Sequence, residues 1–298
     1  MLRLQIVSDL HLEFGDIVIE NTTNADVLIL SGDIMLAEDL YKQPIEKYKD
    51  ISVSSLKHSQ ARAHRFREFL KRVCSQFADV IYVAGNHEFY GGRWVDSIKH
   101  LRAECAVYPN LHFLEQDCVT IKDVTFVGGT LWTDMNKIDP LTLHATTDLM
   151  NDFKVIRNDE AGFTALRPAH TVSRHRRTLE YIKLIVGGQH DKTFVVVGHH
   201  TPSSLSTHPK FVNEYLMNGA FSSDLSEFIL DHPQIKLWTC GHTHHSHRYY
   251  IGDTLVVCNP RGYEGKESGT GFHPSKCVEL GNLPTKEEVD SDYKWANF

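Results

Sequence analysis

Five short apolar segments of this chain end in side chains that bind metal ions or transfer protons. The segments are LQIVS, VLILS, VIYVA, FVVVG and KLWTC. The residues that follow them are Asp9, His11, Asp33, Asn86, His87, His199, His200, His242 and His244. A single aspartate after a strand is usually a turn or cap residue, and a single histidine usually belongs to the surface or the core. The repetition at five segment ends favours a cluster of ligands instead.

Apolar runs rich in β-branched residues predict the strands that carry this cluster. They cover residues 2–8, 27–31, 80–84, 124–128, 194–198, 237–240 and 254–258. Between them, apolar residues recur every three or four positions within 63–77, 94–105 and 172–186, which predicts helices. Strands that alternate with helices indicate a layered α/β fold. Ligands of open α/β sheets bind beyond the carboxyl ends of the strands, where these side chains lie.

The donor types indicate the kind of metal site. Carboxylate, imidazole and amide donors suit divalent Mn, Fe, Zn, Co or Ni. The cluster contains no thiolate, which disfavours a closed structural zinc site. Two aspartates, one asparagine and four histidines are too many for one tetrahedral ion. Their number matches two divalent ions that share a bridging carboxylate.

The order of the motifs resembles that of the calcineurin-like metallophosphoesterases. DxH, GD, GNHE, a histidine after a strand and GHxH follow one another between residues 9 and 244. The surrounding SDLHLEF, GTLWTD and VVVGHHTPS are similar to uncharacterised microbial and phage members of that group. The resemblance implies an α/β fold of the metallo-dependent phosphatase type, a four-layer α/β/β/α sandwich.

The resemblance also implies a role for each site residue. The ligands would be Asp9, His11 and His244 for the first ion, Asn86, His199 and His242 for the second, and Asp33 between both. His199 is chosen over His200 because the ligand in this group directly follows the strand. His87 would lie near the leaving group, as a general acid or as a hydrogen-bond donor to phosphate.

This ligand set predicts a dinuclear metal-dependent hydrolase of phosphoesters. Two divalent ions with two aspartates leave the site formally positive even with a bridging hydroxide, so it attracts a phosphate anion. Coordination lowers the pKa of water to about 7, which supplies a metal-bound hydroxide to attack phosphorus at neutral pH. The imidazole of His87 can donate a proton near the same pH.

One departure from the pattern narrows the function. After Asp33 the chain reads IMLA, where the protein-phosphatase branch has a VDRG-like stretch with an arginine. We therefore do not expect a Ser/Thr protein phosphatase. The group that orients His87 stays open at this point, with Glu38, Asp39 and Glu88 as candidates.

Composition bears on the partners. The chain has 298 residues with a formal net charge of −7, which disfavours a broad nucleic-acid-binding face. The densest basic run, RHRR at 174–177, is expected on an exposed helix face. We expect a small phosphodiester or phosphomonoester substrate, nucleotides included; the oligomeric state is left open.

We expect a single domain over residues 1–298, with two loop or cap segments inserted near 35–59 and 133–165. In the second segment, Lys154 and Arg157 could bind a further phosphate or could belong to a solvated face. Trp132 is expected in the core, although it could stack on a base. The polar tail at 281–298 is expected to be loosely held.

The six cysteines are scattered without a CxxC pair, which indicates reduced core thiols and not a disulfide framework. The first residues do not resemble a signal peptide. No apolar run approaches the roughly 18 residues of a membrane span. Together these features predict a cytoplasmic protein without a membrane anchor.

Two other functions are compatible with part of the pattern. A non-catalytic metal-binding scaffold of the same fold would keep the architecture without turnover. Histidine-rich metal storage would use the 19 histidines of the chain, several of which lie in GHTHHSH. The complete ligand set with His87 beside it favours the enzyme.

Overall fold

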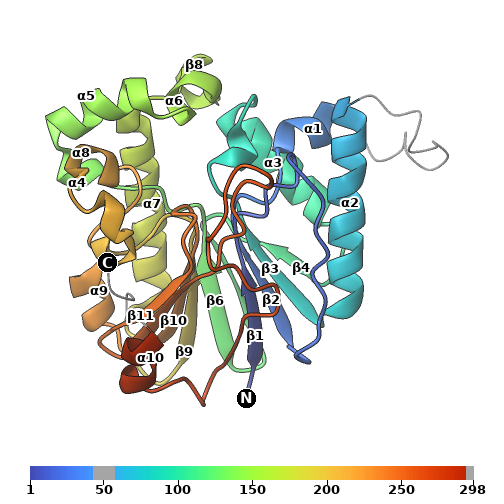
Figure 1. The fold of residues 1–298 in the computed structure, drawn as a ribbon, viewed down its shortest axis with the longest axis vertical. Helices are drawn as coiled ribbons and strands as arrows, with labels where there is room; N and C mark the ends of the chain where they lie inside the picture. The colour runs from blue at the N-terminus through green and yellow to red at the C-terminus, as the bar shows by residue number, and fades with distance from the viewer. Residues whose placement is uncertain (43–57, 293–298) are drawn as a thin grey trace.

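Two β-sheets packed face to face form the centre of the computed structural model, which describes residues 1–42 and 58–292 (Figure 1). The first sheet has the order β13 (Cys277–Glu279), β1 (Arg3–Val7), β2 (Val27–Ser31), β3 (Asp79–Val83) and β4 (Leu111–Phe113). The second has the order β11 (His247–Ile251), β12 (Thr254–Cys258), β10 (Ile235–Cys240), β9 (Thr193–Val197), β6 (Val124–Gly128) and β5 (Asp117–Ile121). A two-stranded ribbon joins β7 (Arg157–Asn158) to β8 (Thr164–Ala165).

The seven predicted apolar runs are all strands. In each sheet four neighbouring strands run parallel, β1 to β4 in the first and β6, β9, β10 and β12 in the second. Parallel strands covered on both faces are apolar almost throughout, so they are visible in the sequence. Strands β4, β5, β11 and β13 were not predicted, because they are short or lie at or near the sheet edges with polar residues on one side.

Helices cover the outer face of each sheet and complete the four layers (Figure 1). Beside the first sheet are α1 (Ala37–Lys42), α2 (His58–Gln76) and α3 (Trp94–Cys105). Beside the second are α7 (Pro168–Val186) and α9 (Ser226–Leu230). The remaining helical segments are α4 (Met135–Ile138), α5 (Pro140–Leu149), α6 (Asp152–Val155), α8 (Tyr215–Asn218) and α10 (Lys286–Asp292). The α/β/β/α sandwich and the three predicted helices are thereby confirmed.

The core between the sheets is built from alternate strand residues. Ile29 and Val83 of the first sheet meet Phe126, Val197 and Leu237 of the second, and all five side chains are fully buried. Residues of opposite parity face the helices, because successive strand side chains point to opposite faces. One buried polar contact crosses this apolar layer, between the hydroxyls of Ser31 and Thr239 at 2.8 Å.

The segment 133–165, expected as a loop or cap, has secondary structure of its own. It folds into α4, α5, α6 and the β7–β8 ribbon. The carboxylates of Asp134 and Asp139 accept hydrogen bonds from the backbone of Lys137 and Thr142 and so cap two of these turns. The elements are too short to show a repeating apolar period. Of the other expected insert, 35–59, residues 43–57 lie outside the described part.

The basic run at 174–177 is only partly exposed, contrary to expectation. Arg176 and Arg177 face solvent, but Arg174 and His175 are buried. The Arg174 guanidinium lies 4.0 Å from the ring centre of Trp94, and it donates a hydrogen bond to Asn158. The Arg174 side chain thus packs inside the protein and is not exposed to solvent. Of the tail expected at 281–298, residues 281–292 are better held than expected, since Val289 is fully buried, and residues 293–298 lie outside the described part.

The cysteines agree with the expectation of reduced thiols. All six are unpaired, and Cys105, Cys240 and Cys258 are buried. Burial raises the pKa of the Cys258 thiol well above its usual range, which keeps it neutral in the core between the second sheet and its helices. Among the described helices, none has the length and apolar character needed to cross a bilayer.

We expect Phe126→Ala to lower the free energy of unfolding by about 3–5 kcal/mol, because it opens a cavity between the sheets. Urea denaturation followed by circular dichroism measures the change. Leu184→Ala is the control, since Leu184 is 74% exposed on α7 and its truncation should stay within about 0.5 kcal/mol. A small effect at Phe126 would contradict the close packing of the two sheets.

Candidate metal centre

The loops after β1, β2, β3, β9 and β10 meet at the upper edge of the two sheets in Figure 1 and bring the predicted ligands together. Donor atoms of Asp9, His11, Asp33 and His244 lie within 4.8 Å of one another, and so do those of Asp33, His199 and His242. The Asn86 Oδ1 atom lies 3.1 Å from His199 Nε2. Asp33 is therefore common to two adjacent groups of donors, all of them buried or nearly so.

Five of these residues hold a left-handed backbone, which is unusual outside glycine. The φ angles are +50° for Asp9, +45° for His11, +55° for Asp33, +68° for His242 and +48° for His244. Each such turn redirects the chain sharply beyond the end of its strand. Strained backbone of this kind persists only where surrounding contacts over-determine it, and it gathers at functional sites.

Gly32 shows how closely the loops approach. Its φ is +84°, and a Cβ atom there would lie 2.5 Å from the His199 ring nitrogen and 2.7 Å from the backbone of Gly85. Only glycine fits this position. The Gly-Asp pair after β2 thus lets Asp33 reach both groups of ligands.

The hydrogen bonds of His199 leave its Nε2 atom facing oxygen. Its Nδ1 atom donates to the Ser31 carbonyl at 2.9 Å. Its Nε2 atom faces Asn86 Oδ1 at 3.1 Å and Asp33 Oδ1 at 3.4 Å. Burial lowers the pKa of His199, but the Asp33 charge outweighs burial and raises it to about 10, which favours a proton on Nε2. A divalent cation held among these atoms would take the place of that proton.

The other histidines fit metal coordination in the same way. His11 and His244 each direct Nδ1 to a carboxylate, Glu13 at 3.1 Å and Glu267 at 2.6 Å, and their Nε2 atoms lie 3.1 Å apart. Two nitrogens at about 2.1 Å from one ion in adjacent positions are about 3 Å apart. Carboxylates behind ligand histidines typically orient them.

His242 further tests whether these residues fit a bound metal ion. Its Nε2 atom is buried and has no hydrogen-bond partner among the described residues. Its backbone N–H donates to Asp9 Oδ1 at 2.9 Å, which ties the loop after β10 to the loop after β1. A buried imidazole nitrogen without a partner is costly unless a ligand satisfies it. The donor set therefore fits divalent cations.

His87 lies beside the ligands in a network of its own. Its backbone N–H donates to Asp33 Oδ1 at 2.8 Å, and its Nδ1 and Nε2 atoms face Glu13 Oε1 at 2.9 Å and the Tyr263 hydroxyl at 3.1 Å. Its ring stacks on Tyr90, with ring centres 4.1 Å apart. Burial lowers the pKa of His87, but the charges of Asp33 and Glu13 outweigh it and raise the pKa. The protonated form is favoured.

Glu13 orients His87, which corrects the three candidates taken from the sequence. Burial raises the pKa of Glu13, but hydrogen bonds from His11 and His87 outweigh it and lower the pKa to about 2. Of the earlier candidates, Asp39 pairs with Arg62 at 2.6 Å, and Glu88 binds backbone instead. Glu13 could have been considered from the sequence, because it is the last acidic residue of the SDLHLEF motif that also contains Asp9 and His11.

The buried carboxylate of Glu88 joins two of the ligand loops. It accepts hydrogen bonds from the backbone N–H groups of Asp33 at 3.0 Å, Ile34 at 2.7 Å and Gly85 at 2.6 Å, and from the Tyr82 hydroxyl at 2.7 Å. Burial and the Asp33 charge raise its pKa to about 7. Glu88 thereby holds the turn after β2 against the turn after β3.

Two other residues considered from the sequence, Trp132 and His200, have structural roles. Trp132 is 3% exposed and packs against Phe89 and Trp94, as expected for a core residue, and it stacks on His200. Burial lowers the pKa of His200 to about 3, so it is a neutral residue behind the donor groups. Lys154 and Arg157 are exposed.

Comparisons with known proteins give the family and the fold of this chain. Residues 2–246 match the family model described as calcineurin-like phosphoesterase. An uncharacterised protein of Acanthamoeba polyphaga mimivirus is 24% identical over 295 residues, which cover 94% of this chain and 97% of that protein. A phosphopantetheinyl hydrolase from Mycobacterium tuberculosis shares the fold, with a TM-score of 0.63, 15% identity and coverage of 87% and 89%. A dimetal phosphatase from Danio rerio is 13% identical, with a TM-score of 0.48 and 88% coverage of each chain.

We expect Glu88→Gln to lower the free energy of unfolding by about 2–4 kcal/mol, because an amide NH₂ group would face backbone N–H donors and leave them unsatisfied. Thermal and urea denaturation measure the loss. Glu68→Gln, with 49% of the wild-type side chain exposed, is the matched control. If both variants unfold like the wild type, the carboxylate is not needed to hold the loops together.

Proposed function

The chain belongs to the calcineurin-like phosphoesterase family and is a metal-dependent phosphoesterase; from this premise we propose that it holds two divalent ions and hydrolyses a small phosphodiester or phosphomonoester. The observation that carries the proposal is the position of Asp33, whose carboxylate is shared by two groups of buried donors. Such sharing is what two ions at roughly 3.5–4 Å require.

The ligand roles follow from the two groups. Asp9, His11 and His244 would hold the first ion, and Asn86, His199 and His242 the second, with Asp33 between them. When bound, the ions supply Lewis acidity toward the phosphoryl oxygens and activate the attacking water. The histidine Nδ1 contacts to Ser31, Glu13 and Glu267 fix the rings before any ion binds.

His87 is proposed to donate a proton or a hydrogen bond toward the leaving oxygen. Glu13 holds its Nδ1 atom, and the Tyr263 hydroxyl lies at its Nε2 atom. The nearby Asp33 and Glu13 charges favour the imidazolium, which is the form that can donate. Tyr90 stacks on the ring and excludes water from one face.

We propose that the substrate is a small phosphoester and not a nucleic acid, and the reason is the distribution of positive charge. The formal net charge is −7, and burial of Arg174 removes one cation from the densest basic run. Binding to a phosphate backbone needs several exposed cations in line. The cytoplasmic location stays a prediction, which the six unpaired cysteines support.

The central experiment measures initial rates of Mn²⁺-loaded protein on a chromogenic phosphodiester and on the matching monoester. We expect chelation to abolish both rates and Mn²⁺ to restore them. Asp33→Asn should lose more than roughly 100-fold in rate, since it weakens the shared ligand. The ratio of the two wild-type rates assigns the diester or monoester class.

Circular dichroism and metal analysis accompany the Asp33→Asn variant. Asp231→Asn serves as the control, because Asp231 lies on the surface beyond α9. Full activity in a folded Asp33→Asn protein would refute the dinuclear mechanism. Wild-type protein that holds two ions without turnover would favour the non-catalytic scaffold.

We expect Glu13→Gln to lower kcat about 10- to 100-fold, because the neutral amide positions His11 and His87 less well. Glu13 acts through these two rings, so KM should change less than kcat. Steady-state kinetics at saturating Mn²⁺ separate the two constants. The exposed Glu20 provides the control Glu20→Gln; equal kcat values in both variants would remove Glu13 from the mechanism.

A further inference from the structure

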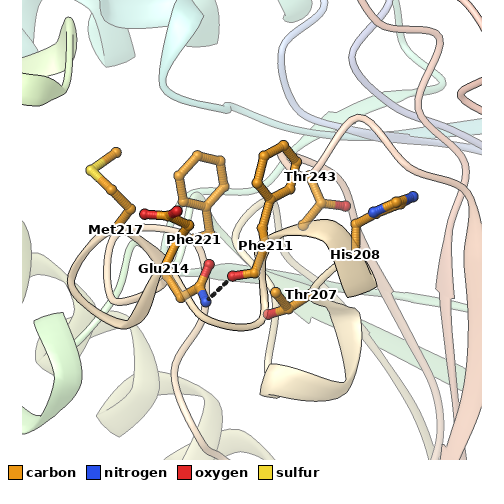
Figure 2. A pocket seen from close by; sticks show the side chains of 8 residues that line it. Thr207, His208, Phe211, Glu214, Met217, Phe221 and Thr243 are labelled. Carbon is orange, nitrogen blue, oxygen red and sulfur yellow. Dashed lines mark hydrogen bonds between the residues drawn. The ribbon is translucent and has the colours of Figure 1, made fainter.

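A pocket of about 320 Å³ lies next to the second group of proposed ligands. Figure 2 shows the side chains that line it. The pocket is lined by Thr207, His208, Phe211, Glu214, Met217, Asn218, Phe221 and Thr243. Two of these residues connect it to the ligands. The Phe221 ring centre lies 4.6 Å from that of His242, and Thr243 stands between His242 and His244 in the chain.

Most of the surface that lines the pocket is apolar. Figure 2 shows the side chains of Phe211, Met217 and Phe221 projecting from the segment that follows β9. The volume is at the small end of ligand sites, which hold one ring or a short chain. An apolar group bound here would gain burial against two aromatic rings.

The charge of the lining argues against a second anion. Glu214 is the one carboxylate among the lining residues, and none of the eight is a lysine or arginine. Lys210 holds its ammonium 5.4 Å from the Phe211 ring centre, but it is exposed and does not line the pocket. A second anionic group in the pocket would meet Glu214, and none of the eight lining residues is a lysine or arginine that would offset this charge.

The pocket walls are held in place before any ligand binds. Asn218 donates to the Phe211 carbonyl at 2.8 Å and closes the segment on itself. The 133–165 segment braces the far side, since Thr133 donates to the Gly219 carbonyl at 2.7 Å and Asn136 to the Tyr215 carbonyl at 3.0 Å. A preformed wall lowers the entropy that binding must overcome.

We propose that this pocket binds the uncharged apolar part of the phosphoester substrate while the phosphate lies on the metal centre. The inference rests on the proposed function and narrows it. It assigns the substrate to phosphoesters of uncharged aryl or alkyl alcohols, as opposed to polyphosphates or phosphorylated acids. Phe211 and Phe221 are the residues that determine this preference.

The test compares phenylphosphonate with methylphosphonate by titration calorimetry on Mn²⁺-loaded wild-type protein. Both probes carry the same phosphonate, so the ratio of their Kd values reports on the phenyl group. We expect phenylphosphonate to bind about tenfold more tightly. Equal affinities would overturn the pocket assignment and leave the phosphoesterase standing. Absence of binding by both probes would count against the phosphoesterase itself, and the pocket assignment would fall with it.

Phe211→Ala locates the phenyl group. Phe211 is 48% exposed, so its truncation should not unfold the protein, and we expect the ratio of affinities to fall to about threefold or less. The neighbouring Val212 is 57% exposed and does not line the pocket, so Val212→Ala should keep the wild-type ratio. A wild-type ratio in Phe211→Ala would place the phenyl group elsewhere and overturn the proposal.

A charged probe tests the proposed substrate class. We expect 4-carboxyphenylphosphonate to bind the wild type more weakly than phenylphosphonate, because its carboxylate meets Glu214. Glu214→Gln should reduce the ratio of the two Kd values about twofold. The change is modest because Glu214 is exposed and its charge is screened by salt. Equal wild-type affinities for these two probes would contradict the preference for uncharged groups.

Discussion

The metal centre depends on turns that place left-handed backbone directly after parallel strands. Five non-glycine ligands adopt positive φ there, at a cost of about 1–2 kcal/mol each. Rigid neighbours must offset this cost. The strands supply these neighbours, since each loop leaves a strand that is buried at its carboxyl end. Backbone N–H groups of the loops also donate hydrogen bonds to the carboxylates of Glu88 and Asp9, which tie the loops to one another. The ligands are therefore held by backbone geometry before any ion binds.

The parts of the fold and the site that could be predicted are those whose pattern lies within one short stretch of sequence. A parallel strand buried on both faces is a continuous apolar run, so β1, β2 and β3 and the ligands after them were recognisable. The segment around α5 was not, because its caps and short turns leave no repeating period. His87 shows the same division. Its place in GNHE is visible locally, whereas its contact with Tyr263 joins residues 176 positions apart, and the sequence alone gives no pairing across that distance.

The network around His87 joins the proposed proton donor to a proposed metal ligand through one carboxylate oxygen. Glu13 Oε1 lies 2.9 Å from His87 and 3.1 Å from His11, which is a proposed ligand. A shift of the loop after β1 would move both rings together. The carboxylates behind His11 and His244 come from opposite ends of the chain, Glu13 and Glu267. The proposed metal ligands and the proposed proton donor thus share a set of supporting contacts that only the complete fold assembles.

The ligands and the apolar pocket have different structural origins, and this has an evolutionary consequence. Every proposed ligand follows the end of a sheet strand. Apart from Thr243, however, the pocket wall belongs to the segment after β9, which is hydrogen-bonded to the 133–165 segment by Thr133 and Asn136. Mutations can accumulate in that wall without disturbing the backbone of the donor groups. Descendants of one ancestor could diverge in the alcohols they accept while they retain the same hydrolytic apparatus. A combinatorial library confined to the wall would give a protein engineer the same freedom.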